Sequence, residues 1–227
     1  MKPIFDRDYP VTSILLILTS LVFVLMFLSY GFQYSSSEAL YHFGAVRGYT
    51  IQEMPMEFWR VFAAIFVHIG LEHFVVNMLT LYFLGRQIEA IFGSWKFLIL
   101  YLMSGVMGNL FVVYFSPESL AAGASTALFG LFASVVVLRY ATRNYYLQQL
   151  GQSYMNLLAV NLIMSFLPGI SLAGHLGGLV GGALGAVILP VSGECYAFSK
   201  SQRFLALAAY LGLAAILIFL TFQRPIF

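Results

Sequence analysis

The segment most informative about the fold is ISLAGHLGGLVGGALGAVIL, residues 170–189. His175 is its only titratable residue, and its length matches the roughly 20 apolar residues that a helix needs to cross a bilayer. Its glycines recur at intervals of four, in two series: Gly174, Gly178 and Gly182, and Gly177, Gly181 and Gly185. Small residues at this spacing let helix backbones approach closely. The segment therefore predicts a membrane-spanning helix packed tightly against its neighbours.

Apolar segments of similar length recur along the whole chain. We predict spans at about 11–30, 61–84, 97–115, 120–138, 153–169, 170–189 and 204–222. The first is too long for a signal-peptide core. Charged residues make up 9% of the sequence, whereas soluble domains average about 25%. These features predict an all-α fold, a polytopic membrane helical bundle that forms a single domain over residues 1–227.

Residues 31–60 form the one long connection between predicted spans. This segment is too polar to cross a membrane, and it carries aromatic residues up to the pair Trp59 and Arg60. Trp and Tyr favour the boundary between headgroups and hydrocarbon. We therefore expect an amphipathic element in the outer interface, in which Trp59 and Arg60 have a structural role.

The basic residues indicate an orientation, because cytoplasmic loops carry an excess of Lys and Arg. With a cytoplasmic N-terminus, the cytoplasmic basic residues are Lys2, Arg7, Arg86, Lys96, Arg139, Arg143, Lys200 and Arg203. Only Arg47, Arg60 and Arg224 then lie outside. We expect a multi-pass protein of the plasma membrane of a prokaryote. This topology puts the starts of spans 120–138 and 170–189 near the outer face.

Ser125 and His175 stand out because each lies at the outer end of an apolar span. A hydroxyl or an imidazole in hydrocarbon costs free energy unless it has a partner, so such groups are functional candidates. A lone serine in a membrane is more often a helix-packing residue. A serine and a histidine at the same depth instead predict a nucleophile and its general base.

His73 and Asn77 strengthen this interpretation, because residues four apart lie on one helical face. The Ser125 backbone N–H is among the first four of its predicted helix, which lack intrahelical acceptors. Donors aimed at one developing negative charge form an oxyanion hole. We therefore predict that His73, Asn77 and the Ser125 amide bind the oxyanion, with His68 supporting the outer cavity.

No carboxylate is available in the predicted spans to orient His175. Asp6 and Asp8 are N-terminal, Glu118 lies in a loop, and Glu72 belongs beside His73. A dyad rather than a triad is therefore expected. Phe129, one turn after Ser125, is a candidate to stack on the imidazole.

Other chemistries fit the sequence poorly. Zinc-binding helices place histidines four apart, whereas His68 and His73 are five apart, about 140° around a helix. An aspartyl mechanism needs two membrane carboxylates, and no Asp lies in a predicted span. We expect no metal and no cofactor. A net charge of +2 with scattered basic residues also argues against nucleic acid as a partner.

These residues together resemble the rhomboid family of intramembrane serine proteases. The matching residues are Trp59, Arg60, His68, His73, Asn77, Gly123, Ala124, Ser125, Gly174, His175, Gly178 and Gly182. The resemblance implies a six-helix core plus one C-terminal transmembrane helix and the catalytic roles given above. We also expect Gly123, Phe129, His68 and Gly178 to support the site. Thr126 replaces the glycine that usually follows the family's serine; Thr is small enough that we expect activity to survive.

The resemblance also implies substrates, which are single-span transmembrane proteins that enter sideways between the second and fifth spans and are cut near the outer face. Membrane lipids are the other expected partners, and the sequence makes no prediction about oligomeric state. One alternative is a catalytically silent rhomboid-like protein that binds membrane clients; its signature, loss of Ser or His, is not seen here. A channel or transporter would predict paired repeats, and the sequence has no duplicated halves.

Overall fold

The computed structural model describes residues 6–191 and 197–225, so Lys2 lies outside the described residues. Within these ranges the chain is helical, with one isolated antiparallel bridge between Val46 and Ala121 and no strand. Three helices are long and apolar enough to cross a membrane: α1 (Pro10–Tyr30), α7 (Ser94–Phe115) and α11 (Lys200–Gln223). Helices α8 (Ser125–Ala141) and α10 (Leu172–Ile188) are shorter and apolar. The predicted all-α bundle is confirmed, while its division into six core helices plus one stays a prediction.

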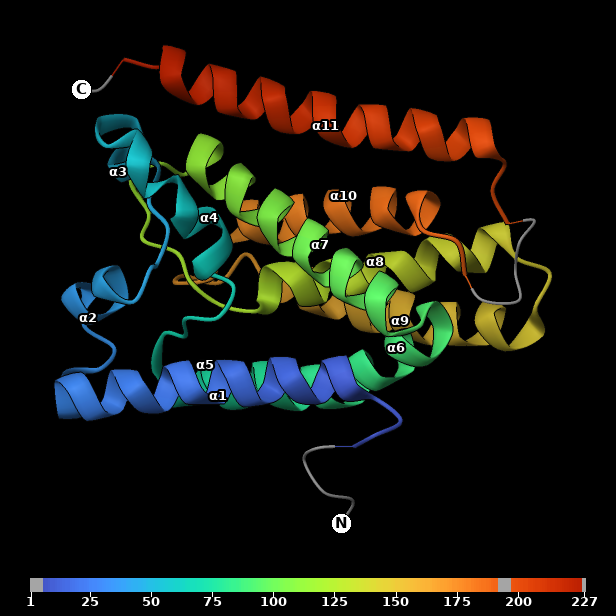
Figure 1. Ribbon diagram of the computed structural model, residues 1–227, viewed down its shortest axis with the longest axis horizontal. Coiled ribbons are helices and arrows are strands. Elements are labelled where there is room, and N and C mark those ends of the chain that lie inside the picture. The colour runs from blue at the N-terminus through green and yellow to red at the C-terminus, as the bar shows by residue number, and fades with distance from the viewer. Residues whose placement is uncertain (1–5, 192–196, 226–227) are drawn as a thin grey trace.

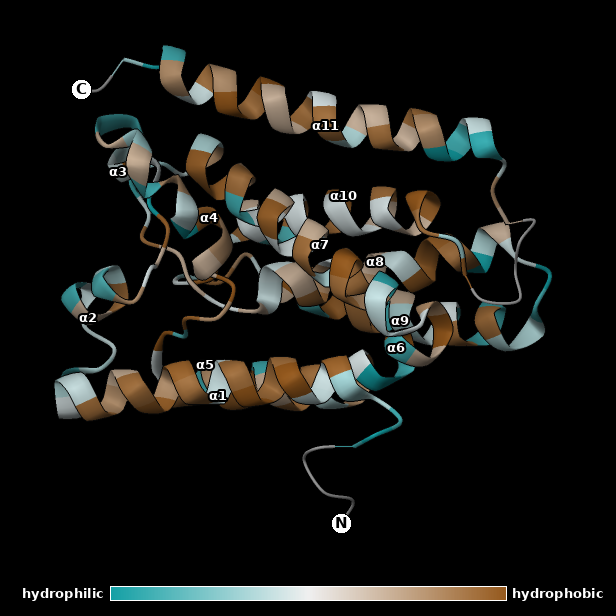
Figure 2. Cartoon of the chain, in the orientation of Figure 1, coloured by the Kyte–Doolittle hydropathy of each residue, from teal (hydrophilic) through white to brown (hydrophobic). Residues whose placement is uncertain are grey.

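The long helices run roughly along one axis, with α1 and α11 on opposite sides and α7, α8 and α10 between them (Figure 1). Helix α10 packs against both α7 and α8, and α9 (Tyr145–Met164) packs against α8. Figure 2 shows hydrophobic residues along most of α1, with hydrophilic residues near the helix ends. This distribution is that of a bundle whose sides face hydrocarbon and whose ends face water.

The two glycine series of α10 face two different neighbouring helices, α8 and α7. A methyl group added at Gly178 or Gly182 would overlap the backbone of α8, at Thr126 and Gly130 respectively. At Gly177 it would meet the Phe111 side chain of α7. Helix α10 is therefore wedged between α7 and α8 at a distance that only residues without a side chain allow.

The second predicted span, 61–84, differs from the observed structure. Helix α4 (Arg60–Ala63) ends early, and a non-helical stretch leads to α5 (Gly70–Thr80), a π-helical turn (Leu81–Gly85) and α6 (Arg86–Phe92). The break occurs because the Ala64 carbonyl accepts a hydrogen bond from the Gly123 N–H, at 2.9 Å, rather than from its own chain one turn on. The hydropathy of the sequence does not reveal such a tertiary hydrogen bond. The span predicted at 61–84 therefore begins earlier than the observed helix α5.

The fourth span was also predicted to begin too early, at residue 120. Residues 120–124 precede α8 and are not helical, because Ala121 pairs with Val46 through two 2.8 Å backbone hydrogen bonds. The fifth span was predicted at 153–169, whereas α9 starts at Tyr145. The N-cap of α9 is Asn144, whose side chain accepts a hydrogen bond from the Leu147 N–H at 3.3 Å. The first turns of α9 contain polar residues, so hydropathy alone does not predict them as part of a span. The remaining spans shift by only a few residues at their ends.

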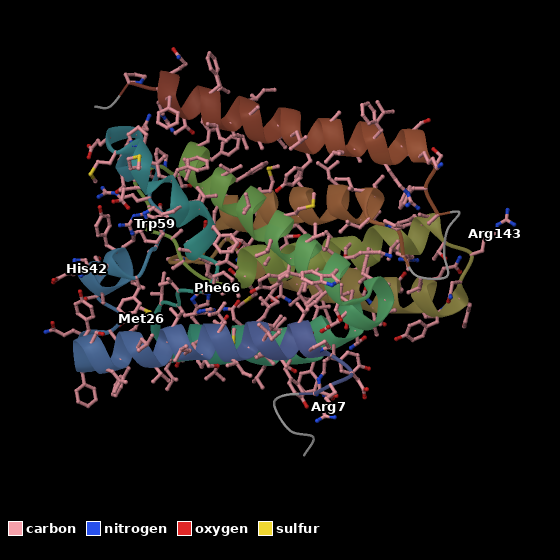
Figure 3. All side chains as sticks on the ribbon, viewed as in Figure 1. Arg7, Met26, His42, Trp59, Phe66 and Arg143 are labelled. Carbon is pink, nitrogen blue, oxygen red and sulfur yellow. The ribbon has the colours of Figure 1, made fainter. Side chains whose placement is uncertain are left out.

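The connection between α1 and α5 contains short helices rather than an unstructured loop. They are a 3-10 turn (Gly31–Gln33), α2 (Ser37–His42), α3 (Gly48–Glu53) and a second 3-10 turn (Pro55–Trp59) before α4. Buried Arg60 holds them together: it pairs with Glu57 at 2.8 Å, donates to the Tyr41 carbonyl, and lies over the Tyr41 and Trp59 rings. These contacts support the structural role predicted for Trp59 and Arg60. Figure 3 shows Trp59 at the end of the bundle opposite Arg143.

A second buried anchor, Glu89 of α6, caps the N-terminus of α1. Its carboxylate accepts from the Val11 N–H at 3.0 Å, the Thr12 N–H at 2.8 Å, the Thr12 hydroxyl at 2.7 Å and the Ser94 hydroxyl at 2.7 Å. A carboxylate is favoured there by the unpaired amides and the dipole of the helix.

We expect Glu89→Gln to lower the free energy of unfolding by about 2 to 3 kcal/mol, because the amide retains a single acceptor oxygen and no charge. Thermal unfolding in detergent micelles measures the change. Exposed Glu72 provides the matched control, Glu72→Gln. Equal melting temperatures for the two variants would contradict a role for Glu89 as an anchor.

Candidate active site

The Ser125 hydroxyl and the His175 imidazole lie within hydrogen-bonding distance, 3.0 Å between Oγ and Nε2. Ser125 is the first residue of α8 and His175 is in the first turn of α10, where the Ser171 hydroxyl caps the helix by accepting from the Gly174 N–H at 3.1 Å. Because the first turns of two packed helices meet here, the two side chains lie at the same depth. His175 is 7% exposed.

The backbone before Ser125 is fixed by residues from the α4–α5 connection. The Gly123 N–H donates to the Ala64 carbonyl, and the Ala124 N–H donates to Nε2 of His68 at 3.3 Å. Gly123 has φ +141°, a conformation that favours glycine. His68 therefore supports the site by holding the turn that aims Ser125, rather than by facing the hydroxyl.

His73 lies directly over this turn. A methyl group added at Gly123 would be 2.5 Å from Cε1 of His73 and 2.8 Å from its Nε2. The ring of His73 also lies 5.2 Å from that of His68, centroid to centroid. The structure thus brings His73 to the loop that carries Ser125, and the glycine at position 123 leaves room for its imidazole.

Asn77 is buried on the same helix but turns back toward its own backbone. Its Nδ2 donates to the His73 carbonyl at 2.7 Å. Within the described ranges Asn77 makes no hydrogen bond to Ser125 or His175. A primary amide has two N–H donors, so this bond occupies one of them.

Two side chains hold the His175 ring in place. Phe129 stacks on it, with centroids 3.9 Å apart and planes 12° from parallel. The Ser165 hydroxyl lies 2.6 Å from Nδ1 of His175. The stacking is as expected, whereas the contact with Ser165 was not predicted, because a carboxylate is the usual group that orients a catalytic histidine. The sequence feature that could have indicated Ser165 is its position as a polar residue inside the apolar segment 153–169.

Thr126, which replaces the usual glycine, fits into space left by other glycines. Its Cγ2 would lie 3.0 Å from a methyl group added at Gly174, and its Cβ would crowd one added at Gly108 of α7. Its buried hydroxyl has no hydrogen-bond partner within residues 6–191 and 197–225. The structure therefore accommodates the larger residue through paired small residues on α7 and α10.

The described residues contain no cluster of three or more His, Cys, Asp or Glu side chains that could hold a metal ion. What the site does contain is a hydroxyl, an imidazole that contacts it, and backbone and side-chain donors nearby. Such a set can carry out acyl transfer by nucleophilic attack with general-base assistance.

The sequence matches the model of the Rhomboid domain over residues 55–192. It is 32% identical over 226 residues to rhomboid protease GluP of Bacillus subtilis (strain 168), covering 98% of this chain and 43% of that protein. Putative rhomboid protease YdcA of the same organism is 30% identical over 182 residues, 79% of this chain and 88% of the relative.

Inactive RHOMBOID-like protein 8 of Arabidopsis thaliana is also similar, at 30% identity over 147 residues, 64% of this chain and 42% of the relative. The chain thus spans less than half the length of several curated relatives that it matches. Its apolar helices and these similarities make it a multi-pass integral membrane protein. The chain belongs to the rhomboid family.

Proposed function

We propose that this protein is an intramembrane serine protease in which Ser125 is the nucleophile and His175 the general base. The observation that carries the proposal is the 3.0 Å contact between Ser125 Oγ and His175 Nε2 inside an apolar bundle. Similarity to proteins named rhomboid proteases supports the same activity.

The reaction follows from this contact. Ser125 Oγ attacks the carbonyl carbon of a peptide bond while its proton passes to His175 Nε2. The tetrahedral intermediate collapses when the C–N bond breaks, and His175 returns the proton to the leaving amine. Water then attacks the acyl-enzyme with His175 as base, which releases the carboxylate product and restores the Ser125 hydroxyl.

The negative oxygen of the tetrahedral intermediate needs hydrogen-bond donors. We assign the Ser125 backbone N–H, His73 and Asn77 to this role. His73 lies beside the turn that carries Ser125, whereas the Asn77 amide uses its second hydrogen or leaves the His73 carbonyl when substrate binds. Asn77 is thus one donor among three.

We expect Asn77→Ala to lower kcat by about 10² to 10³, the usual effect of removing one oxyanion donor. KM should change little, because the oxyanion exists only after attack. Initial rates of substrate cleavage measure both constants. Gln87→Ala is the control, since half-buried Gln87 makes a similar bond to the carbonyl one turn back, at Phe83. Loss as complete as in Ser125→Ala would contradict a shared oxyanion site.

The substrates that fit this site are single-span transmembrane proteins, cut near the outer face of the membrane. Helices α5 and α9 both contact α8, the helix that begins at Ser125, so a substrate that enters between α5 and α9 would reach Ser125 from the side. We place the N-terminus in the cytoplasm of a prokaryote whose plasma membrane holds the protein. The position of Arg143 at the end opposite Trp59 supports this orientation (Figure 3).

The alternative function is that of a catalytically silent protein that binds membrane clients. Similarity to a relative named inactive supports this alternative. Cleavage of a model single-span substrate in liposomes separates the two functions. Purified protein and its Ser125→Ala variant are compared, with and without a metal chelator. Chelator-resistant cleavage that disappears in the variant supports the serine protease. Client binding without cleavage by the unmodified protein supports the silent binder.

A further inference from the structure

His175 has a second polar partner besides Ser125. Its Nδ1 lies 2.6 Å from the hydroxyl oxygen of Ser165, the residue that follows the last residue of α9 and caps that helix. Ser165 is 2% exposed and His175 is 7% exposed, so this contact is shielded from bulk solvent. The two nitrogens of the imidazole therefore each face a serine hydroxyl, on opposite sides of the ring.

The direction of the Ser165 hydrogen bond follows from a third atom. The Ser165 oxygen also lies 2.8 Å from the carbonyl oxygen of Asn161, one turn earlier in α9. A carbonyl only accepts, and a hydroxyl has one hydrogen. If that hydrogen pointed at His175, two oxygens would face each other without a proton between them, which is unfavourable for buried groups. The hydroxyl therefore donates to Asn161.

This assignment determines where the proton of His175 resides. Because the Ser165 hydrogen is used, its oxygen accepts from the imidazole, and Nδ1 carries the N–H. A neutral imidazole has one N–H, so Nε2 is unprotonated. The unprotonated nitrogen is the one that faces Ser125, at 3.0 Å, which is the tautomer that a general base requires.

We infer that Ser165 is a positioning residue that fixes the tautomer and the orientation of His175, in a Ser125–His175–Ser165 chain. The inference rests on the proposed function. When Nε2 takes the proton of Ser125, Nδ1 keeps its own proton and its bond to Ser165, so the bond holds the imidazolium ring in place as well. A hydroxyl thus stands where a carboxylate would serve in a triad.

The local fold keeps Ser165 beside His175. Ser165 caps the C-terminus of α9, and its N–H donates to the Asn161 carbonyl at 3.0 Å. Gly169, with φ +84°, lies in the turn between α9 and α10. Phe129 covers a face of the imidazole. The ring is therefore fixed in its plane by Ser125 and Ser165 and across its plane by Phe129.

Ser165→Ala, Ser165→Thr and the control Ser153→Ala test the inference. Ser153 lies on the same helix and makes the same kind of bond, to the Gln149 carbonyl at 3.2 Å, but is exposed. We expect Ser165→Ala to lower kcat about 10- to 100-fold, part of the roughly 10² to 10⁴ contributed by a positioned base. KM should be unchanged, Ser165→Thr should restore most of the rate, and Ser153→Ala should match the parent.

The tautomer itself is read by NMR of protein labelled with ¹⁵N in histidine, using Ser125→Ala and His73→Ala spectra to aid assignment. We expect an unprotonated Nε2 in the parent and a larger share of protonated Nε2 in Ser165→Ala. An unchanged tautomer, or loss of rate that Ser165→Thr does not restore, would overturn the inference. Should Ser165→Ala unfold, the same measurements on Ser165→Cys, which keeps the size but accepts weakly, replace it.

Failure of this inference is distinguishable from failure of the proposed function. Labelling of the unmodified protein by a fluorophosphonate depends on Ser125 being a nucleophile, whatever Ser165 does. Labelling of the parent, together with parental kcat and tautomer in Ser165→Ala, would overturn the role of Ser165 and leave the protease intact. Absence of labelling and cleavage in the parent would overturn both.

Discussion

Ser125→Ala is expected to lower the rate of transmembrane-substrate cleavage by at least about 10⁴-fold, and His175→Ala by a similar factor. In the proposed mechanism, the first variant removes the atom that forms the acyl-enzyme. The second removes the acceptor of its proton, which lies 3.0 Å away. If the two residues act as one unit, as proposed, the double variant should be no slower than either single variant. Initial rates in liposomes measure all three.

The control for the histidine is His42→Ala. His42 is exposed in α2 and contacts the Tyr30 hydroxyl, outside the site. It should cleave at the parental rate, and all variants should unfold at similar temperatures. Cleavage by Ser125→Ala within tenfold of the parent would contradict nucleophilic catalysis by this residue.

Gly178→Val is expected to abolish activity for a different reason. Any side chain at position 178 collides with the carbonyl group of Thr126, the residue after Ser125. Overpacking costs typically about 1 to 3 kcal/mol, and here it moves α10 away from α8. His175 lies one turn before Gly178 and moves with the helix, so we expect a loss of at least about 100-fold, since small misplacements of reacting groups cost that much.

The matched control is Gly212→Val on α11, where an added side chain meets no atom within 4 Å. It makes the same change of residue in an exposed helical position and should keep the parental rate and melting temperature. Normal turnover by Gly178→Val would show that the close approach of α10 to α8 does not set the catalytic geometry.

The sequence predicted best those features that depend on local pattern. The spacing of Gly174, Gly178 and Gly182 predicted the close packing of α10. The length of the apolar segments predicted the ends of α1, α7 and α11 to within a few residues. Both are properties of a single helix, and hydrocarbon restricts a spanning backbone to few alternatives.

Features that depend on tertiary hydrogen bonds were not predictable in this way. The start of α8 at Ser125 depends on Ala121 pairing with Val46, from a segment about 75 residues earlier in the chain. Similarly, the partner of His175 Nδ1 is Ser165, because the turn between α9 and α10 folds one helix end over the other. Residue type pointed to Ser125 and His175. A serine within an apolar segment could also have marked Ser165 as a candidate, but only the geometry shows that it contacts His175.

The most direct test of the central claim, that His175 activates Ser125, is mass spectrometry of the protein after reaction with a fluorophosphonate. The account predicts one covalent adduct on the peptide that contains Ser125. The adduct should be absent from Ser125→Ala and form far more slowly in His175→Ala, because the hydroxyl then lacks its base. An adduct on another residue, or equal labelling rates in the parent and His175→Ala, would contradict the account.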